Sequence, residues 1–259
     1  MTVLDPDPMT GEAVPIRPNL CLQVCHSPGT APALVFLHGG LGNRYNWRAQ
    51  YQFAQQQGWE ALTYDLAGNG QSSPYRRYSM GRHGRDLARL LKRFQIQKPV
   101  LCCHSYGVPL GLEWAQRHPV SGLILICGGT HNLDPWWEGP LMRALIWGGR
   151  HLFHLPQAQQ ISRRLTSLHE HEQIEQFFAE SPVPTDLHPY KALEIFWGYN
   201  FFERQRSSVR DIPALIISGG RDITFTDSMA AELASHFRPS QRLHIPEAGH
   251  VVMAEYPEL

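Results

Sequence analysis

The segment from Val100 to Val108, Val-Leu-Cys-Cys-His-Ser-Tyr-Gly-Val, constrains the fold more than any other part of this chain. An apolar run typical of a buried strand ends in a serine, and residues 110–115 then have the composition of a helix. A strand that turns sharply into a helix at a serine is a nucleophile elbow, which pushes the hydroxyl out of the backbone. The close approach of strand and helix requires small residues two positions before and after Ser105. Gly107 meets this requirement, whereas Cys103 stands where glycine is usual.

The chain around this segment alternates strand-like and helix-like stretches. We predict strands at residues 13–17, 20–26, 33–37, 60–64, 99–104, 123–127, 214–218 and 242–245 and helices at 44–57, 80–94 and 228–237. The first two strands form an antiparallel hairpin with a tight Pro-Asn turn. Residues 33–37 are a continuous apolar run, as in a strand buried on both faces of a sheet, and 60–64 is a second strand of this kind. This pattern predicts an α/β fold with a mostly parallel sheet and helices on both faces.

The alternation breaks between about residues 130 and 210. This stretch shows helical patterns, one at 173–180, and is rich in large aromatic residues. We predict that 130–210 forms a helical cap inserted after the sixth strand, between two core segments at 1–129 and 211–259. Some of its aromatic rings form the small core of the cap, and the others line a substrate cavity that suits an apolar ligand. The aromatic residues that we expect to contact substrate are Trp136 and Trp197.

Two loops after late strands offer the partners that a serine nucleophile requires. A serine hydroxyl is a poor nucleophile at neutral pH and depends on a positioned base, which a third group orients. Asp222 ends a Gly-Gly-Arg-Asp turn, and His250 ends an Ala-Gly-His loop. We predict that Ser105 is the nucleophile, His250 the base and Asp222 the group that orients the base. Asp134, after the sixth strand, is the alternative acid.

The loop at residues 38–42, His-Gly-Gly-Leu-Gly, follows an apolar strand directly. We predict that the backbone N–H of Gly40 or Leu41, together with that of Tyr106, stabilises a developing oxyanion. Backbone donors depend on loop shape, which explains why glycines are needed there. The residues of this loop that we expect to contact substrate are His38 and Gly39.

Five motifs in one order carry a resemblance to a known family. They are His-Gly-Gly-Leu-Gly (38–42), Asp-Leu-Ala-Gly-Asn-Gly-Gln-Ser (65–72), His-Ser-Tyr-Gly (104–107), Gly-Gly-Arg-Asp (219–222) and Ala-Gly-His (248–250). With them the chain resembles the α/β-hydrolase-fold serine hydrolases over nearly its whole length, and most of all the eighth abhydrolase-domain subfamily. The chain order Ser, Asp, His is the one expected of that fold. The Asp65 motif is expected to be a structural turn.

The resemblance implies an eight-stranded, mostly parallel sheet flanked by helices, and the hydrolysis of a small-molecule carboxylic ester or thioester with an apolar portion. Acyl transfer, C–C hydrolysis and cofactor-free peroxidation use the same triad and stay open. So does ligand binding by a receptor with a vestigial triad, because one fold hosts many activities. No metal and no organic cofactor are implied. The run His-Glu-His-Glu at 169–172 lacks a helical ligand spacing, so we predict no metal site there.

Two features depart from the family pattern. Cys103 replaces an elbow glycine, and we disfavour it as an alternative nucleophile because a thiol inside a buried strand is generally inert. The sequence ends at Pro257-Glu258-Leu259, where the family usually begins a final helix that covers the sheet. If the surface under that helix is open, we expect a partner or a dimer contact to cover it. The oligomeric state is left open.

Charge and cysteine content narrow the partners. With 23 basic and 23 acidic residues the net charge is zero, which argues against nucleic acid as a partner. The basic residues between 76 and 93 form a solvated helix face, with weak contact to an anionic membrane surface as the alternative. No signal peptide and no apolar run of roughly 18 residues are seen, so we predict no transmembrane segment. Five cysteines without metal-type spacing favour the cytoplasm.

Overall fold

A computed structural model describes residues 7–129, 140, 144, 147–148, 151–152, 155–167, 171–184, 186–193, 195 and 210–258. Its strands are β1 (Glu12–Arg17), β2 (Leu20–Ser27), β3 (Thr30–Leu37), β4 (Trp59–Tyr64), β5 (Val100–His104), β6 (Gly122–Ile126), β7 (Ala214–Gly219) and β8 (Ser240–Ile245). Its helices are the 3₁₀ turn η1 (Arg44–Trp47), α1 (Arg48–Gln56), α2 (Met80–Arg93), α3 (Gly107–Ala115), α5 (Pro156–Thr166), α6 (Glu172–Glu180), α7 (His188–Leu193), α9 (Asp227–Ser235) and α10 (Val252–Glu255). The predicted strands and helices are confirmed to within a few residues.

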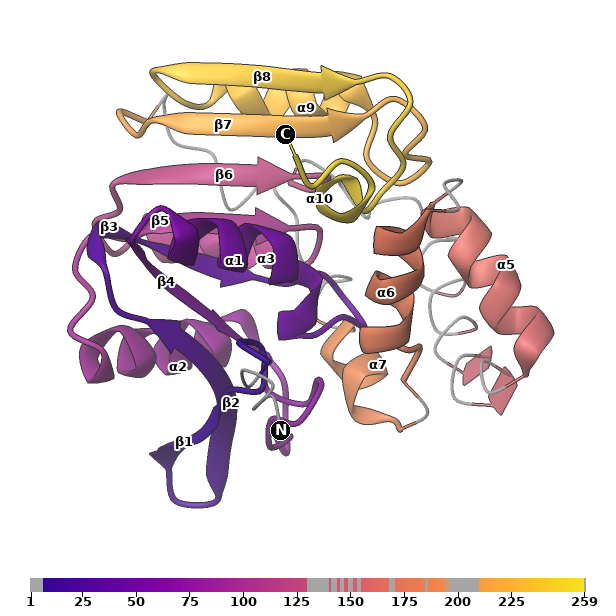
Figure 1. Cartoon of the computed structure of the whole chain (residues 1–259), viewed down its shortest axis with the longest axis horizontal. Coiled ribbons are helices and arrows are strands. Elements are labelled where there is room, and N and C mark those ends of the chain that lie inside the picture. The colour runs from indigo at the N-terminus through magenta and orange to yellow at the C-terminus, as the bar shows by residue number, and fades with distance from the viewer. Residues whose placement is uncertain are drawn as a thin grey trace, which may run out of the picture.

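Within the described residues, eight strands form one sheet in the order β1-β2-β4-β3-β5-β6-β7-β8 (Figure 1). β2 pairs antiparallel with β1 and β4, and every pair from β4–β3 to β7–β8 is parallel. The first hairpin turns at Asn19, whose φ of 61° lies in the left-handed region that asparagine tolerates better than most residues. This is the α/β-hydrolase fold that the motifs imply.

Helices cover the two faces of the sheet unequally. One core packs α2, α3 and α9 against side chains such as Leu101 and Leu125. The other core packs α1 and α10 against the alternate side chains, such as Phe36 and Cys102. Successive side chains of a strand point to opposite faces, so each buried strand serves both cores. This explains why the inner strands read as unbroken apolar runs.

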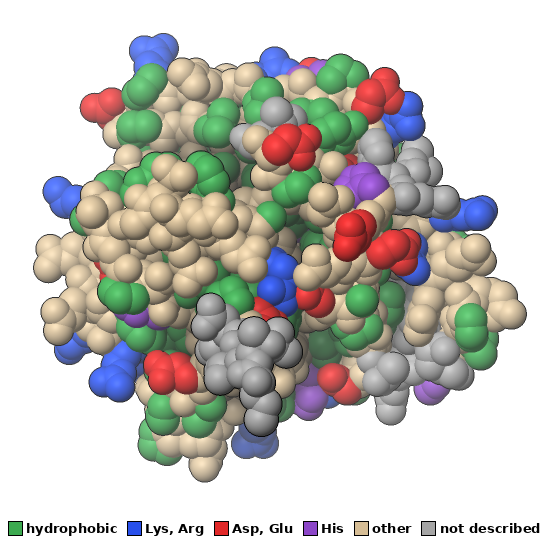
Figure 2. Space-filling view, viewed as in Figure 1, with side chains coloured by type: hydrophobic (Ala, Val, Ile, Leu, Met, Phe, Trp, Pro, Cys, Tyr) green, Lys and Arg blue, Asp and Glu red, His purple; other side chains and the backbone are tan. Residues whose placement is uncertain are grey.

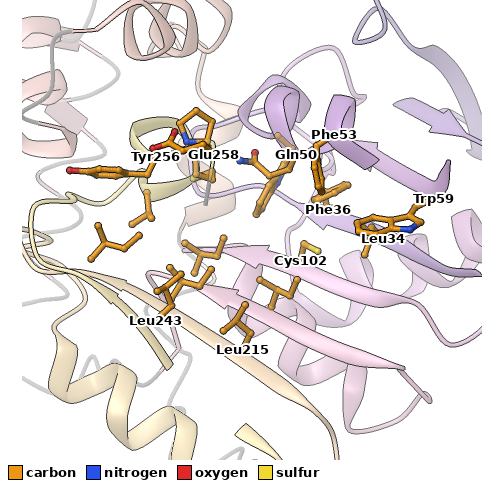
Figure 3. Close-up of a pocket in the computed structure, with 18 residues that line it drawn as sticks. Leu34, Phe36, Gln50, Phe53, Trp59, Cys102, Leu215, Leu243, Tyr256 and Glu258 are labelled. Atoms are coloured by element: carbon orange, nitrogen blue, oxygen red, sulfur yellow. Dashed lines mark hydrogen bonds between the residues drawn. The ribbon is translucent and has the colours of Figure 1, made fainter. Parts of the chain in front are cut away.

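An open apolar trough lies on the face that α1 and α10 cover only in part (Figures 2 and 3). It measures about 420 Å³. The side chains that line it come from β3, β5, β6, β7 and β8, with Phe53 and Trp59 at one end and Tyr256 and Glu258 at the other. Phe53 is 51% exposed. Parallel sheets are normally covered on both faces. Among the described residues, this part of the sheet face is therefore covered less completely than the opposite face.

The described residues between β6 and β7 include α5, α6 and α7, which lie beyond the carboxyl end of the sheet (Figure 1). Asn43 donates its side-chain N–H to the carbonyl of Glu180 at 3.0 Å, and Arg48 pairs with the Glu180 carboxylate at 2.7 Å. These bonds fix the end of α6 to the loop before η1 and to the start of α1. The cap boundaries at 130 and 210 stay a prediction. None of the described helices combines the length and the hydropathy that a membrane span requires.

Candidate active site

Ser105 occupies a strained turn between β5 and α3. Its φ of 47° is left-handed, a conformation that costs energy for a residue with a side chain. The backbone around it is nonetheless paired: the Ser105 N–H donates to the Ile126 carbonyl at 2.9 Å, and its own carbonyl accepts from Val108 N at 3.0 Å. The strain is thus held by β6 on one side and by the first turn of α3 on the other. The arrangement has the geometry expected of a nucleophile elbow.

The crowding expected from Cys103 is relieved by a glycine in the following helix. A Cβ on Gly111 of α3 would collide with the Cys103 sulfur. The glycine that makes room between strand and helix is therefore on α3 in this chain, whereas it is usually on the strand. Gly107 meets the Leu37 carbonyl in the same close way. Cys103 is completely buried, and burial raises the pKa of its thiol well above the usual value. Burial and a raised thiol pKa both disfavour Cys103 as an alternative nucleophile.

Ser105, His250 and Asp222 form one hydrogen-bonded chain. His250 Nε2 lies 3.0 Å from Ser105 Oγ, and His250 Nδ1 lies 2.8 Å from Asp222 Oδ2. The second carboxylate oxygen, Oδ1, accepts from the backbone N–H groups of Thr224 at 2.7 Å and Phe225 at 3.1 Å. Burial opposes ionisation of Asp222, but the His250 side chain and these amides outweigh it, so the pKa of Asp222 lies below its usual value. The carboxylate is therefore charged and fully bonded at neutral pH.

Neighbouring residues hold both the ring and the backbone of His250. Phe225 stacks on it with centroids 5.8 Å apart and an interplanar angle of 15°. His104, the residue before Ser105, lies within 2.8 Å of the His250 carbonyl through its Nε2, and the His250 N–H donates to the Thr166 carbonyl at 3.0 Å. Burial, followed by the proximity of His250, lowers the pKa of His104 to about 3. His104 is therefore neutral and serves as a hydrogen-bonding partner of the loop.

The predicted oxyanion loop is a tight turn against the elbow. Gly42 N–H donates to the Gly39 carbonyl at 3.3 Å, and Leu41 has a φ of 60°. A Cβ built on Gly39 would lie 3.3 Å from Ser105 Cβ, and one built on Gly40 would lie 3.7 Å from Tyr106 Cβ. The loop and the start of α3 therefore meet beside the serine hydroxyl. Two backbone donors at such a junction match what a developing oxyanion requires.

His38 and Asp65 make buried contacts around the loop at residues 38–42. His38 is fully buried, its Nε2 accepts from the Leu66 N–H at 2.9 Å, and its Nδ1 lies 2.7 Å from the Gly39 carbonyl. Both ring nitrogens are therefore engaged within the protein, so the imidazole shapes the loop and offers no nitrogen to a substrate. Asp65 is equally buried and pairs with Arg44 at 2.7 Å. The turn at 65–72 is thus structural, as the sequence led us to expect.

Three predicted residues, Trp136, Trp197 and the alternative acid Asp134, fall outside the described residues. In the 169–172 run, His171 is described, and its Nε2 lies 3.1 Å from the Glu255 carbonyl. The roles of His104 and Phe225 beside His250 escaped the sequence analysis. Cys127 escaped it as well, although it lies with Asp222 and His250 in a group that could hold a metal ion. The signal available in the sequence was the position of each residue. His104 directly precedes the serine, Phe225 comes three residues after the acid, and Cys127 ends a predicted strand.

Comparison with known proteins supports the fold described above. The sequence model of the family described as alpha/beta hydrolase fold matches residues 32–257. Protein ABHD8 of Bos taurus is similar over 110 residues at 33% identity, covering 40% of this chain and 26% of that protein, so the match spans about a quarter of the relative. The sn-1-specific diacylglycerol lipase ABHD11 of Mus musculus is 25% identical over 95% of this chain and 84% of its own length. The solved esterase EaEST of Exiguobacterium antarcticum superposes with a TM-score of 0.81 at 17% identity, covering 96% of this chain and 95% of that one.

Proposed function

Since the chain belongs to the alpha/beta hydrolase fold family, we propose that it is a serine hydrolase that cleaves a carboxylic ester or thioester with an apolar acyl or alcohol portion. The observation that carries the proposal is the continuous hydrogen-bonded chain from Ser105 Oγ through His250 to Asp222. A base within reach of the nucleophile, oriented by a third group, is the arrangement that activates a serine.

In the proposed reaction His250 Nε2 takes the Ser105 proton while Ser105 Oγ attacks the carbonyl carbon. The negative charge that develops on the carbonyl oxygen meets the backbone N–H of Gly40 or Leu41 and that of Tyr106. The tetrahedral intermediate then expels the alcohol or thiol, which takes the proton from His250 and leaves an acyl-enzyme. In the second half, water gives a proton to His250 and attacks the acyl carbon, and the bond between this carbon and Ser105 Oγ then breaks. His250 returns the proton to Ser105 Oγ, and the acid is released. The charged Asp222 stabilises the imidazolium in both steps.

An apolar substrate portion is supported by the surroundings of the oxyanion loop. The half-buried side chain of Leu193, at the end of α7, lies directly against Gly40. The predicted cap around it contributes large aromatic residues, which favour apolar ligands. The mouse relative is named as a diacylglycerol lipase and the solved neighbour as an esterase. We therefore propose that the acyl chain passes between the oxyanion loop and α7.

Other activities of the same triad differ in what the acyl-enzyme or the ligand does next. An acyltransferase diverts the acyl group to an added alcohol, and a peroxidase consumes hydrogen peroxide. A C–C hydrolase cleaves a ketone, and a receptor binds its ligand tightly with slow turnover. Water as acceptor and an ester as substrate form our first choice because no further residue is needed to hold an acceptor. Each alternative is excluded or supported by the product formed.

The proposal is tested by hydrolysis of p-nitrophenyl esters from acetyl to palmitoyl, with Ser105→Ala as the blank. We expect Ser105→Ala to lose roughly 10⁴-fold or more in kcat/KM, because members of a triad act as a unit. An unchanged unfolding temperature of the variant controls for loss of the fold. A wild-type rate equal to that of Ser105→Ala on every ester would overturn the ester-hydrolase proposal.

A further inference from the structure

Three metal-ligating groups converge beside the proposed triad. Cys127 Sγ, a carboxylate oxygen of Asp222 and a ring nitrogen of His250 all lie within 4.8 Å of one another. Cys127 and Asp222 are buried, at 2% and 7% exposure, and the side chain of His250 is 18% exposed. A thiol, a carboxylate and an imidazole form a mixed donor set of the kind that zinc selects.

The position of Cys127 is built into the sheet. It follows β6 directly, its N–H donates to the Ile217 carbonyl at 3.0 Å, and its φ of 47° lies in the left-handed region. Its sulfur lies 3.9 Å from the Gly249 carbonyl oxygen, a further donor at the same place. Like the bonds to Ser105, these contacts come from the carboxyl edge of the parallel strands. The thiol is thus held beside the orienting pair in a defined geometry.

We propose that Cys127, Asp222 and His250 form an inhibitory site for a thiophilic divalent cation, with Zn²⁺ as the fitting ion. Zinc bonds are about 2.3 Å to sulfur and about 2.0 Å to nitrogen or oxygen, so tetrahedral ligand pairs lie roughly 3.3–3.6 Å apart. His250 Nδ1 and Asp222 Oδ2, now 2.8 Å apart, must therefore open by about 0.5 Å, and the Cys127 sulfur, at most 4.8 Å from the other two ligand atoms, must approach them by at most about 1.3 Å. The Gly249 carbonyl or water completes the coordination. Only the inhibitory consequence rests on the proposed hydrolase function.

Metal binding changes the tautomer of His250. In the free enzyme Nδ1 carries the proton that bonds to Asp222 Oδ2, and Nε2 is free to accept the proton of Ser105. A cation on Nδ1 replaces that proton, and the neutral ring then carries its proton on Nε2. Nε2–H cannot accept the serine proton, so the base is lost. The Cys127 thiol also gives up its proton, and one proton per cation is released overall.

This proton release makes the affinity depend on pH. Burial and the Asp222 carboxylate raise the pKa of Cys127 well above its usual value, so the thiol is protonated in the absence of metal. The charged and titratable groups near the thiol are Asp222, His250 and the buried Glu255, and the ring of His104 lies 4.9 Å from that of His250 between centroids. Since binding releases the thiol proton, the apparent affinity should rise with pH.

The first experiment measures zinc chloride inhibition of ester hydrolysis, each rate expressed relative to the metal-free rate of the same variant. We expect Cys127→Ala to raise the inhibitory concentration by at least 10- to 100-fold, the range seen when even outer-shell partners of a metal are removed. Cys102→Ala is the matched control, because Cys102 is a buried strand cysteine that lines the trough. Equal inhibition of wild type and Cys127→Ala would overturn the site.

The second experiment does not use activity. Cadmium chloride is titrated into Ser105→Ala protein, and the thiolate-to-cadmium absorption band and the proton release are recorded. We expect one absorption band, which is lost in the Ser105→Ala/Cys127→Ala double variant and persists in the Ser105→Ala/Cys102→Ala double variant. A band unaffected by Cys127→Ala would refute the site. A Cys127-dependent band in a protein without ester hydrolysis would support the metal site and refute the proposed function.

Discussion

The pairing of Cys103 with Gly111 makes a quantitative prediction about the elbow. In Gly111→Ala the added Cβ collides with the Cys103 sulfur, while its contacts with Cys103 Cβ at 3.7 Å and Leu101 Cδ1 at 3.9 Å are ordinary. Overpacking of this kind costs about 1–3 kcal/mol, and alanine in a helix regains about 1 kcal/mol over glycine. We therefore expect Gly111→Ala to lower the free energy of unfolding by about 0–2 kcal/mol. In a Cys103→Ala background the collision is absent, and the same substitution should stabilise the protein.

The assay is urea unfolding of wild type, the two single variants and the double variant. The coupling energy of this cycle isolates the collision, and we expect about 1–3 kcal/mol. In thermal unfolding each kcal/mol corresponds to about 2–4 °C for a chain of this size. If Gly111→Ala changes the free energy of unfolding equally in the wild-type and the Cys103→Ala backgrounds, the inference that Gly111 makes room for the Cys103 side chain is wrong.

Two further predictions concern the site. In Gly39→Ala the new Cβ lies 2.6 Å from His104 Nδ1, so the oxyanion loop must move away by nearly 1 Å. In the ester assay kcat should therefore fall on the order of 10²-fold with little change in KM. Gly84→Ala is the control, because a Cβ there meets nothing within 4 Å and should leave kcat unchanged. The pKa of Asp222 is lower in the folded protein than its usual value, so its ionisation stabilises the fold above about pH 3.9 and this contribution is lost as the pH falls through the folded pKa. Urea unfolding from pH 6 to pH 3 should therefore show the stability advantage of wild type over Asp222→Asn shrinking at low pH, and a constant difference would contradict the shift.

The strands and the proposed triad could be predicted because their signals are local. A strand buried on both faces is a continuous apolar run, which the sequence shows at 33–37 and 123–127. Loops after parallel strands meet at one edge of the sheet, so Ser105, Asp222 and His250 could be placed together once the strands were assigned. The identity of the three residue types then determines the chemistry they are able to perform.

Contacts that depend on strand register could not be read from the sequence. His104 pairs with Ile126, and Ile126 pairs with Ile217, which places Cys127 beside the loop of Asp222. No hairpin connects these parallel strands, so no turn in the sequence sets their register. The need for glycine at position 111 could not be read from the sequence either, because it depends on the Cys103 sulfur that lies against it in the fold.

The trough and the proposed active site are mechanically connected through α10. His250 is followed immediately by Val251 and α10, and Val252 and Met253 line the trough. Gln50 of α1 donates to the Met253 carbonyl at 2.8 Å, and the Glu255 carboxylate accepts from the Gly249 N–H at 2.6 Å. The loop that carries His250 is therefore positioned from the trough side of the sheet as well as by His104. Because α10 is a single short turn directly after His250, a change in the apolar packing of α10 against this face is expected to shift His250 as well.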